Sequence, residues 1–382
     1  MTLIKRQLQT VIQDRMFCGK AIILVGARQV GKSTLFGQIL GNPQLDISND
    51  QILTIYCDDA ESRRLLENAS LADLRQQLAG KRLVMVDEAQ RIQGVGLTLK
   101  LITDHFKDVQ LLVTGSSSFL LQGKLNEPLT GRKFEYHLYP LSTKELFDDG
   151  GLLRIRQTFE SRLIYGSYPD VVTGVGNPRD LLMNLSGSYM YQDLLSLEGV
   201  RKPVLLEKLL VALALQVGSE VSYSELAQTI GTDNKTVEKY VDLLEKCYII
   251  FRLNGLSRNL RNELKKAKKV YFYDNGIRNA VIQQFAPLDM RNDVGALWEN
   301  FFISERVKHN HYTGHYCNAY FWRTKTQQEV DYIEESDGTM TAFEMKWNPK
   351  KGNIIFPKAF LEAYNVKETD VVTPDNYMDW LM

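Results

Sequence analysis

The fold of the chain is decided by one stretch, K-A-I-I-L-V-G-A-R-Q-V-G-K-S-T-L (Lys20–Leu35). It begins with an apolar run typical of a buried strand, turns at a glycine, and continues into a helical pattern that begins at Lys32. The spacing from Gly26 through Gly31 to Ser33 matches the G-x-x-x-x-G-K-[ST] pattern of a phosphate-binding loop. Glycines let backbone N–H groups face phosphate oxygens, and the new helix directs its positive amino end at the same anion. The stretch therefore predicts a nucleotide-binding loop.

Each polar side chain of this loop has an expected role. Lys32 would reach the β- and γ-phosphates of ATP, and the Ser33 hydroxyl would hold Mg²⁺. A glycine-containing turn that binds nothing is the alternative, and the strand before the loop and the helix after it argue against that alternative. The expected ATP contacts are Gly26, Ala27, Arg28, Gln29, Val30, Gly31, Lys32, Ser33 and Thr34.

Composition places the chain among globular proteins with two or three domains. The chain has 382 residues, of which 44% are apolar and 24% charged, an ordinary balance. The 46 Lys and Arg residues equal the 46 Asp and Glu residues, so the whole chain shows no bias toward nucleic acid or anionic membranes. Four widely spaced cysteines favour a reducing compartment, and neither a signal peptide nor a membrane-spanning apolar run is visible. We therefore expect a cytoplasmic protein that does not bind membranes.

A pair of acids follows a later apolar run. Arg82–Ala89 reads R-L-V-M-V-D-E-A, four apolar residues followed by two carboxylates, which is the Walker B arrangement. Asp87, at the carboxyl end of a central strand, would hold Mg²⁺ through water, and Glu88 would polarise the attacking water as a general base. Two solvated turn acids are the alternative, and the upstream phosphate-binding loop argues against it.

Two further segments hold candidates for a hydrolytic site. The strand expected at Val109–Val113 ends in hydroxyl side chains, of which Thr114 or Ser116 would sense the γ-phosphate and hold the water. A serine–glycine turn without a catalytic role is the alternative. Arg132 precedes the last expected strand and would reach the γ-phosphate of a neighbouring subunit in a homo-oligomer as an arginine finger. A surface or structural arginine is equally compatible with the sequence.

Strands alternating with helices predict an α/β fold with a parallel sheet. The segments G-A-R-Q-V-G-K-S-T-L, V-D-E-A-Q-R-I, V-T-G-S-S-S, L-T-G-R and L-Y-P-L-S, in this order, resemble AAA-type ATPases of bacteria and archaea whose C-terminal half was long a domain of unknown function. Further downstream, Gly166–Asp170, Tyr191–Leu194 and Lys269–Gly276 are similar to later motifs of that family, so the resemblance covers nearly the whole chain. It implies a P-loop NTPase sheet of the AAA (ASCE) type that binds ATP with Mg²⁺ and hydrolyses it.

The expected organisation is an ATPase over residues 1–145, a helical lid or connector over 146–200, a winged-helix domain over 201–285 and a nuclease-like domain over 286–382. Ser222 and Ser224 would cap the first helix of the winged helix and Asp233 the second, with Gly231 turning the chain between them. Acidic and basic residues nearly cancel on the second of these helices. For this helix, packing against protein is therefore favoured over DNA binding.

A basic cluster lies on or after the wing of the winged helix, with seven Lys and Arg residues between Arg252 and Lys269 and only Glu263 opposing them. Such a cluster can bind a phosphate backbone with strong salt dependence. A solvated loop, or a contact with the acidic residues of the ATPase, is equally compatible. The candidate nucleic-acid contacts are Arg258, Arg261, Lys265, Lys266, Lys268 and Lys269.

The last hundred residues resemble the PD-(D/E)XK nuclease core, a small restriction-endonuclease-like α/β fold. Asp331, Glu344 and Lys346 match its acid and acid-x-lysine signature on successive strands, with Glu299 as an acid carried by a helix. Such carboxylates bind Mg²⁺, and the lysine orients water and steadies negative charge on phosphate. Strand alternation in F-E-M-K-W puts Glu344 and Lys346 on one face. A domain that keeps the fold without cleaving anything is the alternative.

Four potential zinc ligands lie close together in the same region, namely His309, His311, His315 and Cys317. Their short spacings fit a tetrahedral site poorly, so a surface loop is the expectation. For the whole chain we expect ATP hydrolysis coupled to conformational change and an action on nucleic acid, such as DNA, through the C-terminal half. The alternative is a nucleotide-switched scaffold or regulator whose C-terminal half binds a protein partner.

Overall fold

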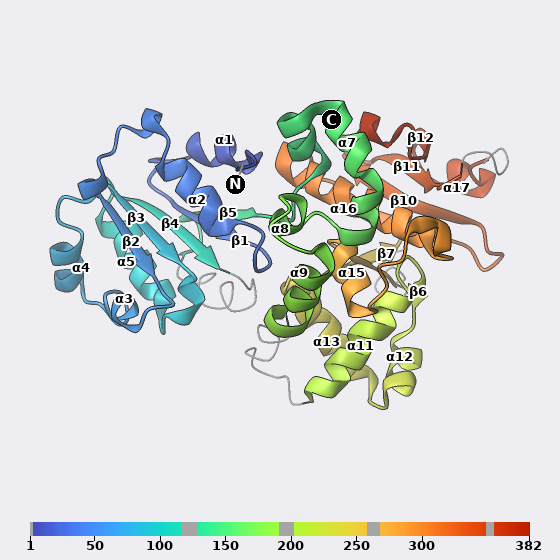
Figure 1. The fold of residues 1–382 in the computed structure, drawn as a ribbon, viewed down its shortest axis with the longest axis horizontal. Helices are drawn as coiled ribbons and strands as arrows, with labels where there is room; N and C mark the ends of the chain where they lie inside the picture. Colours follow the sequence, from blue (N-terminus) through green and yellow to red (C-terminus); the bar gives the residue numbers. More distant parts are fainter. Residues whose placement is uncertain (1–2, 116–128, 191–201, 258–267, 349–354) are drawn as a thin grey trace.

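The chain builds two β-sheets, which lie side by side in Figure 1. The computed structural model describes residues 3–115, 129–190, 202–257, 268–348 and 355–382. The first sheet and its helices form the left part of Figure 1, in blue to cyan, and the rest of the chain forms the right part. Among the described residues, no helix combines the length and the apolar character needed to cross a membrane.

The first sheet consists of five parallel strands in the order β2-β3-β4-β1-β5. These strands are β1 (Ala21–Val25), β2 (Ile52–Tyr56), β3 (Leu83–Asp87), β4 (Gln110–Gly115) and β5 (Lys133–His137). Every residue of β1 is buried, as expected for a central parallel strand covered on both faces. Strand β4 lies between the strand that precedes the glycine-rich loop and the strand that ends at Asp87. The predicted α/β class with a parallel P-loop sheet is therefore confirmed.

Short helices precede or connect these strands. They are α1 (Leu8–Gln13), α2 (Lys32–Leu40), α3 (Ala60–Arg64), α4 (Leu71–Gln77) and α5 (Val95–His105), with 3₁₀ turns η1 (Pro43–Leu45), η2 (Asn49–Gln51) and η3 (Ala89–Arg91). Helices α3 and α4 begin separately because Asp59 and Ser70 each cap one of them with a side-chain oxygen.

The second half begins with helices and ends in a mixed sheet. Its helices are α7 (Thr143–Tyr165), α8 (Pro169–Val172), α9 (Pro178–Asn184), the π-helical η4 (Leu185–Met190), α11 (Pro203–Leu215), α12 (Tyr223–Ile230), α13 (Asn234–Lys246), α15 (Asn275–Val281), η5 (Leu288–Met290), α16 (Val294–Thr313), α17 (Lys358–Ala363) and η6 (Tyr377–Trp380). Its strands are β6 (Glu220–Val221), β7 (Ile250–Gly255), β8 (Lys268–Phe272), β9 (Asn318–Arg323), β10 (Glu329–Ser336), β11 (Thr339–Met345) and β12 (Val366–Val372). Ser222 and Asp233 cap α12 and α13 with their side chains.

One sheet of seven strands joins the two C-terminal regions that the sequence separates at residue 285. Its order is β12-β11-β10-β9-β7-β8-β6, and β7 pairs with β9 in parallel, Asn254 opposite Tyr320 and Gly255 opposite Phe321. Helix α16 packs against β8 as well as β11, so it covers strands of both regions. The two regions therefore share a sheet and a core.

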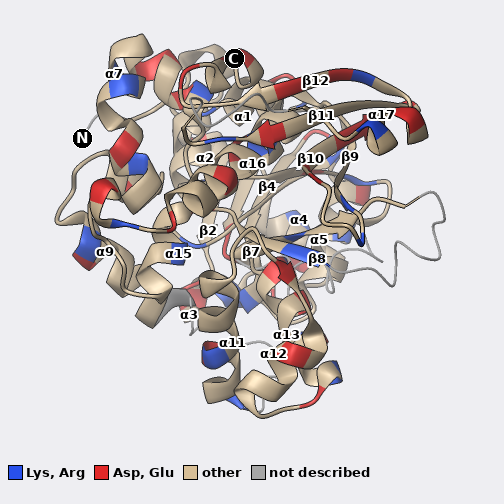
Figure 2. Ribbon diagram, turned by 90° about the vertical axis from the view of Figure 1, so that its right-hand side faces the viewer, with Lys and Arg blue, Asp and Glu red and all other residues tan. Residues whose placement is uncertain are grey.

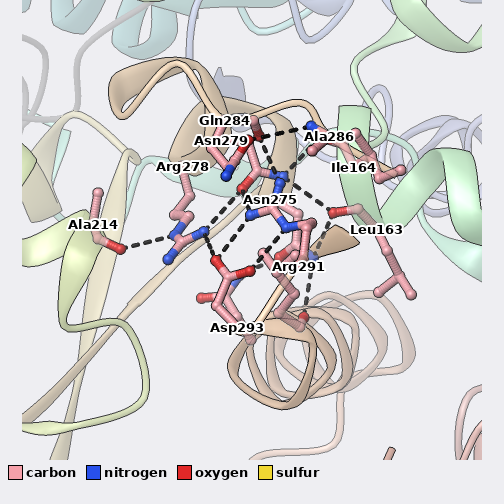
Figure 3. A network of polar contacts seen from close by, with 12 residues as sticks. Leu163, Ile164, Ala214, Asn275, Arg278, Asn279, Gln284, Ala286, Arg291 and Asp293 are labelled. Carbon is pink, nitrogen blue, oxygen red and sulfur yellow. Dashed lines mark hydrogen bonds and ion pairs between the residues drawn. The ribbon is translucent and has the colours of Figure 1, made fainter. Parts of the chain in front are cut away.

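A buried polar network fastens α7, α15 and the start of α16 to one another (Figure 3). The side-chain amide of Asn279 donates to the carbonyl of Ile164 at 2.8 Å. Asp293 accepts from Arg278 at 2.5 Å and from Arg291 at 2.8 Å. Arg278 also donates to the carbonyl of Ala214, at the end of α11, at 2.8 Å. Because these groups are paired while buried, the network holds the helices in one arrangement.

Gly166, which follows α7, lies very close to Asp274, the residue before α15. Gly166 has a φ of +70°, and a Cβ there would overlap the carboxylate of Asp274, which accepts from the backbone N–H of Ser167 at 2.7 Å and caps α15. Gly174 has the same φ, but nothing lies within 4 Å of where its Cβ would be.

Substitutions at Gly166 and Gly174 distinguish the cost of backbone strain from the cost of steric overlap. We expect Gly174→Ala to lower the free energy of unfolding by about 1–2 kcal/mol, the cost of a left-handed backbone. Gly166→Ala should cost several kcal/mol more, because the new methyl group must displace a buried capping carboxylate. Urea unfolding of both variants checks this expectation. Equal losses of stability would contradict it.

Candidate functional site

The loop between β1 and α2 takes a backbone path that suits its glycines. A Cβ on Gly26 would overlap the carbonyl oxygen of Leu138, which follows β5. Gly31, the N-cap of α2, has a φ of +94°, in the region that other residues avoid. The glycine spacing predicted from the sequence therefore corresponds to one close backbone approach and one left-handed turn.

The Lys32 ammonium lies over this loop. Lys32 is buried, and its Nζ donates to the carbonyl oxygens of Gly26 at 3.2 Å and Ala27 at 2.9 Å. A lysine held in the hollow of a glycine-rich loop can exchange these carbonyls for phosphate oxygens, which are stronger acceptors because they are charged.

Residues from three segments meet beside the loop. The Ser33 hydroxyl donates to both carboxylate oxygens of Asp87, at 2.8 and 2.9 Å. The Thr114 hydroxyl donates to Asp87 at 2.5 Å and accepts from the backbone N–H of Glu88 at 2.9 Å. The structure thus brings together α2, the end of β3 and the end of β4. The hydroxyl of Ser33 and the carboxylate of Asp87 are oxygen donors of the kind that Mg²⁺ binds, so these residues fit that ion.

Glu88 has a hydrogen-bond partner, Gln90, that was not predicted from the sequence. The backbone of Glu88 is left-handed, with a φ of +54°, and its carboxylate accepts a hydrogen bond from the side-chain amide of Gln90, which is buried. A strained backbone held by a buried amide gives the Glu88 carboxylate a defined direction. The only signal in the sequence is the position of Gln90 two residues after Glu88.

Arg6 is a second residue of the loop's surroundings that was not predicted from the sequence. Its guanidinium is buried and donates to the carbonyl of Val30, inside the loop, at 2.7 Å. It also donates to the carbonyl of Tyr139 at 2.6 Å and to the carboxylate of Glu145 at 3.0 Å. The N-terminal segment therefore fixes the position of the loop through the Arg6 side chain.

Of the remaining predicted residues of the hydrolytic site, Arg132 lies elsewhere. Arg132 precedes β5 at the amino-terminal end of the sheet, where the N–H of Ala21 donates to its carbonyl, whereas the glycine-rich loop follows the carboxyl end of β1. The Arg132 side chain pairs with Asp104 at 2.6 Å. It therefore does not contribute to the loop of its own chain, and its role toward a neighbouring subunit stays a prediction. Ser116 lies outside the described residues.

A hollow of about 110 Å³ opens beside the loop, at the start of α2. Apolar side chains form much of its wall, with Gln38 and Asp170 as polar neighbours. A mostly apolar recess with a few polar groups suits a flat nucleotide base. The lining residues are Leu3, Ile4, Arg6, Gly31, Thr34, Leu35, Gln38, Leu141, Pro169, Asp170 and Thr173.

The second cluster predicted from the sequence is assembled on β10, β11 and α16. Lys346 Nζ lies 3.0 Å from the carboxylate of Glu344 and 3.9 Å from that of Asp331. The Lys346 side chain is 39% exposed, so the cluster opens to solvent on this side. Glu299, on α16, accepts from the hydroxyl of Tyr271 at 2.6 Å.

The carboxylates of this cluster influence one another. Burial raises the pKa of Glu344 to about 7, and the charge of Asp331 adds to this effect. Burial also raises the pKa of Glu299 to about 7, with Asp331 adding to the shift and Lys269 opposing it. Acids with raised pKa values gathered around a lysine are typical of functional sites, because a bound cation can offset their charge.

Lys269 belongs to this cluster, and its predicted role as a surface contact for nucleic acid is wrong. Only 2% of the residue is exposed, and its ammonium lies 2.6 Å from Glu329 and 3.3 Å from Glu299. Lys268 lies against the ring of Tyr223, 5.2 Å from its centre. The other candidate contacts, Arg258, Arg261, Lys265 and Lys266, lie outside the described residues. In the described part of the chain, basic and acidic residues are interspersed (Figure 2).

The raised pKa values predict how this cluster responds to pH. A carboxyl group must lose its proton to bind a divalent cation, and below its pKa it holds that proton. We therefore expect the affinity of the cluster for Mg²⁺ to rise as the pH increases through about 7. Calorimetric titration of Mg²⁺ without nucleotide measures this affinity. The titration uses an Asp87→Asn background, which removes the carboxylate expected to hold Mg²⁺ at the P-loop. A flat pH profile, or an unchanged profile after Asp331→Asn, would contradict the expectation.

Family models divide the chain in three. Residues 19–147 match the AAA domain. Residues 156–288 match a domain of unknown function (DUF8612), and residues 294–378 match another (DUF4143). Together with the five-stranded parallel sheet and the contacts around Lys32 and Asp87, the first match makes residues 19–147 an AAA-type P-loop domain.

Similar proteins span most of the chain. An uncharacterized protein of Haemophilus influenzae is 26% identical over 275 residues, covering 68% of this chain and 68% of the relative. One of Mycobacterium tuberculosis is 26% identical over 339 residues, covering 85% of this chain and 70% of the relative. Among solved structures, the replication initiator DnaA bound to AMPPCP and single-stranded DNA aligns with a TM-score of 0.33 and 17% identity, over 63% of this chain and 86% of that one. Cdc6p from Pyrobaculum aerophilum aligns with a TM-score of 0.29 and 11% identity, over 72% and 91%.

Proposed function

We propose that the chain binds ATP with Mg²⁺ and hydrolyses it, and that hydrolysis changes the conformation of the C-terminal half. The observation that carries this proposal is the direct hydrogen bonding of Ser33 and Thr114 to Asp87 beside the buried ammonium of Lys32. These side chains come from three separate segments, the start of α2 and the ends of β3 and β4.

Binding would use groups that are already in position. Loop N–H groups and the Lys32 ammonium would bind the β- and γ-phosphates, with Lys32 leaving the carbonyls of Gly26 and Ala27. Ser33 and Asp87 would hold Mg²⁺, whose charge offsets that of the phosphates. The hollow lined by Leu35 and Leu141 would take the adenine base.

Hydrolysis would depend on Glu88. Its carboxylate accepts a proton from water as the water oxygen bonds to the γ-phosphorus and the bond to the ADP oxygen breaks, which gives ADP and phosphate. Gln90 holds the carboxylate, and Thr114 holds the backbone of Glu88 against Asp87. A finger from Arg132 of a neighbouring subunit would complete the site in a homo-oligomer.

The test is the rate of ATP hydrolysis in Glu88→Gln. We expect the rate to fall by about 10²–10⁴-fold, because the general base is lost while the loop and its lysine remain. ATP binding should survive in this variant and be lost in Lys32→Ala. Glu61→Gln, a change at an exposed glutamate elsewhere in the domain, is the matched control and should hydrolyse ATP normally. Hydrolysis by Glu88→Gln at the rate of the unaltered protein would refute the mechanism.

We further propose that the C-terminal half acts on nucleic acid, with Glu299, Asp331, Glu344 and Lys346 as a Mg²⁺-dependent site of the PD-(D/E)XK type. The convergence of Lys346 with Glu344 and Asp331 supports this proposal, since acids and a lysine in that arrangement can hold a cation and a water beside a phosphodiester. The winged helix proposed over α11 to β8 shares the same sheet and would lie alongside the substrate.

Cleavage of DNA distinguishes this proposal from its alternatives. We expect Mg²⁺-dependent cleavage by the unaltered protein and a loss of at least about 10²-fold in Asp331→Ala, since a ligand-bearing carboxylate is removed. Asp375→Ala, at an exposed aspartate outside the cluster, is the control and should cleave normally. Cleavage that persists in Asp331→Ala would show that the cluster is not the site.

A second candidate function is a nucleotide-switched scaffold or regulator that binds a protein partner. It is favoured by the buried position of Lys269 and by the ion pairs of Arg252 with Glu245 and Asp242, which leave these two members of the basic cluster engaged within the chain. Salt-dependent DNA binding that is lost in Lys265→Glu/Lys266→Glu would argue against this candidate.

A further inference from the structure

Three residues of metal-binding type meet where α16 turns into β9. The ligand atoms of His315, Cys317 and Glu334 all lie within 4.8 Å of one another, and no other such group of three occurs among the described residues. The histidines proposed from the sequence to accompany them point elsewhere. His309 Nδ1 lies 3.2 Å from the carbonyl of Leu381, and His311 Nδ1 contacts the hydroxyl of Tyr139.

The turn after α16 creates this arrangement. Gly314 ends the helix in the left-handed region, with a φ of +70°, and the N–H of His315 donates back to the carbonyl of Asn310 at 2.9 Å. The chain therefore folds back on the helix before β9 begins. Because β9 and β10 are antiparallel, with Ala319 opposite Glu334, the glutamate reaches the same place from the neighbouring strand.

Two buried side chains hold the ligands in position. Asn310 is 5% exposed, and its Nδ2 donates to Glu334 Oε1 at 2.7 Å and to Cys317 Sγ at 3.4 Å. Its Oδ1 is buried without a hydrogen-bond partner in the described part of the protein. The guanidinium of Arg306 donates to Glu334 Oε2 at 2.6 Å. Outer contacts of this kind orient metal ligands and are part of a built metal site.

Local charge also favours a cation. His315 and Cys317 line an open cavity of about 560 Å³, whose wall includes Glu335 and Asp337. Glu334, Glu335 and Asp337 carry three negative charges against the one positive charge of Arg306. The Cys317 thiol would release its proton when it binds a metal.

We propose that His315, Cys317 and Glu334 bind Zn²⁺, with a fourth position open to the cavity for water. One imidazole nitrogen, one thiolate and one carboxylate are the donors that tetrahedral zinc takes. Ligand atoms around zinc are about 3.5 Å apart, and the exposed His315 side chain is free to close that distance. The ion would tie the end of α16 to β9 and β10.

Cobalt is the probe, because a Co²⁺–thiolate bond absorbs in the near ultraviolet and reports the cysteine directly. Titration of the full chain, without nucleotide, should give this band at one equivalent, and Zn²⁺ should displace it. Cys317→Ser should abolish the band, and His315→Ala should weaken binding by at least tenfold.

The matched controls are Cys18→Ser, at an exposed cysteine, and His309→Ala, at a histidine on α16 outside the group. Both should retain the band. Unchanged melting temperatures without metal would show that the variants are folded. A band that is absent in the unaltered protein, or that survives Cys317→Ser, would overturn the proposal. Since ATP hydrolysis plays no part in the test, its outcome is independent of the proposed ATPase and nuclease activities.

Discussion

The buried guanidinium of Arg6 connects the phosphate-binding loop with the rest of the structure. It pairs with Glu145 and donates to the carbonyls of Val30 and Tyr139. Glu145 in turn accepts from the N–H of Ser142 and so caps α7. One ion pair therefore joins the N-terminal segment, the loop, the end of the first sheet and the first helix of the second half. Removing one partner of such a buried pair leaves a charge unpaired, which costs about 3–5 kcal/mol.

From this ion pair the contacts continue to α16. The N–H of Tyr139 donates to the Tyr312 hydroxyl at 3.0 Å, and the N–H of Thr143 donates to Glu305 at 2.5 Å. Both acceptors lie on α16, whose other end carries Glu299 of the acidic cluster. One helix therefore contacts the segment that follows the first sheet and also carries an acid of the cluster.

The residues found from the sequence share one property: their chemistry is encoded in local spacing. Glycine intervals identified the loop, and an apolar run before two acids identified Asp87 and Glu88. Parallel strands then bring their carboxyl ends to one edge, which is why Thr114 lies beside Asp87. Arg6 was not predicted, and Lys269 was assigned to the surface, because their partners are distant in sequence, Glu145 by 139 residues and Glu299 by 30. No local pattern marks a single basic residue as buried.

The sequence by itself determined the phosphate-binding loop, the parallel five-stranded sheet and the caps of α12 and α13, since each depends on residues within one or two turns or on the alternation of strands and helices. Only the tertiary structure decided that β7 pairs with β9 in one continuous sheet, that Arg132 lies at the far end of the first sheet, and that Lys269 faces acids rather than solvent. Strand pairing and burial depend on how all elements pack together, and local residue patterns do not encode that packing.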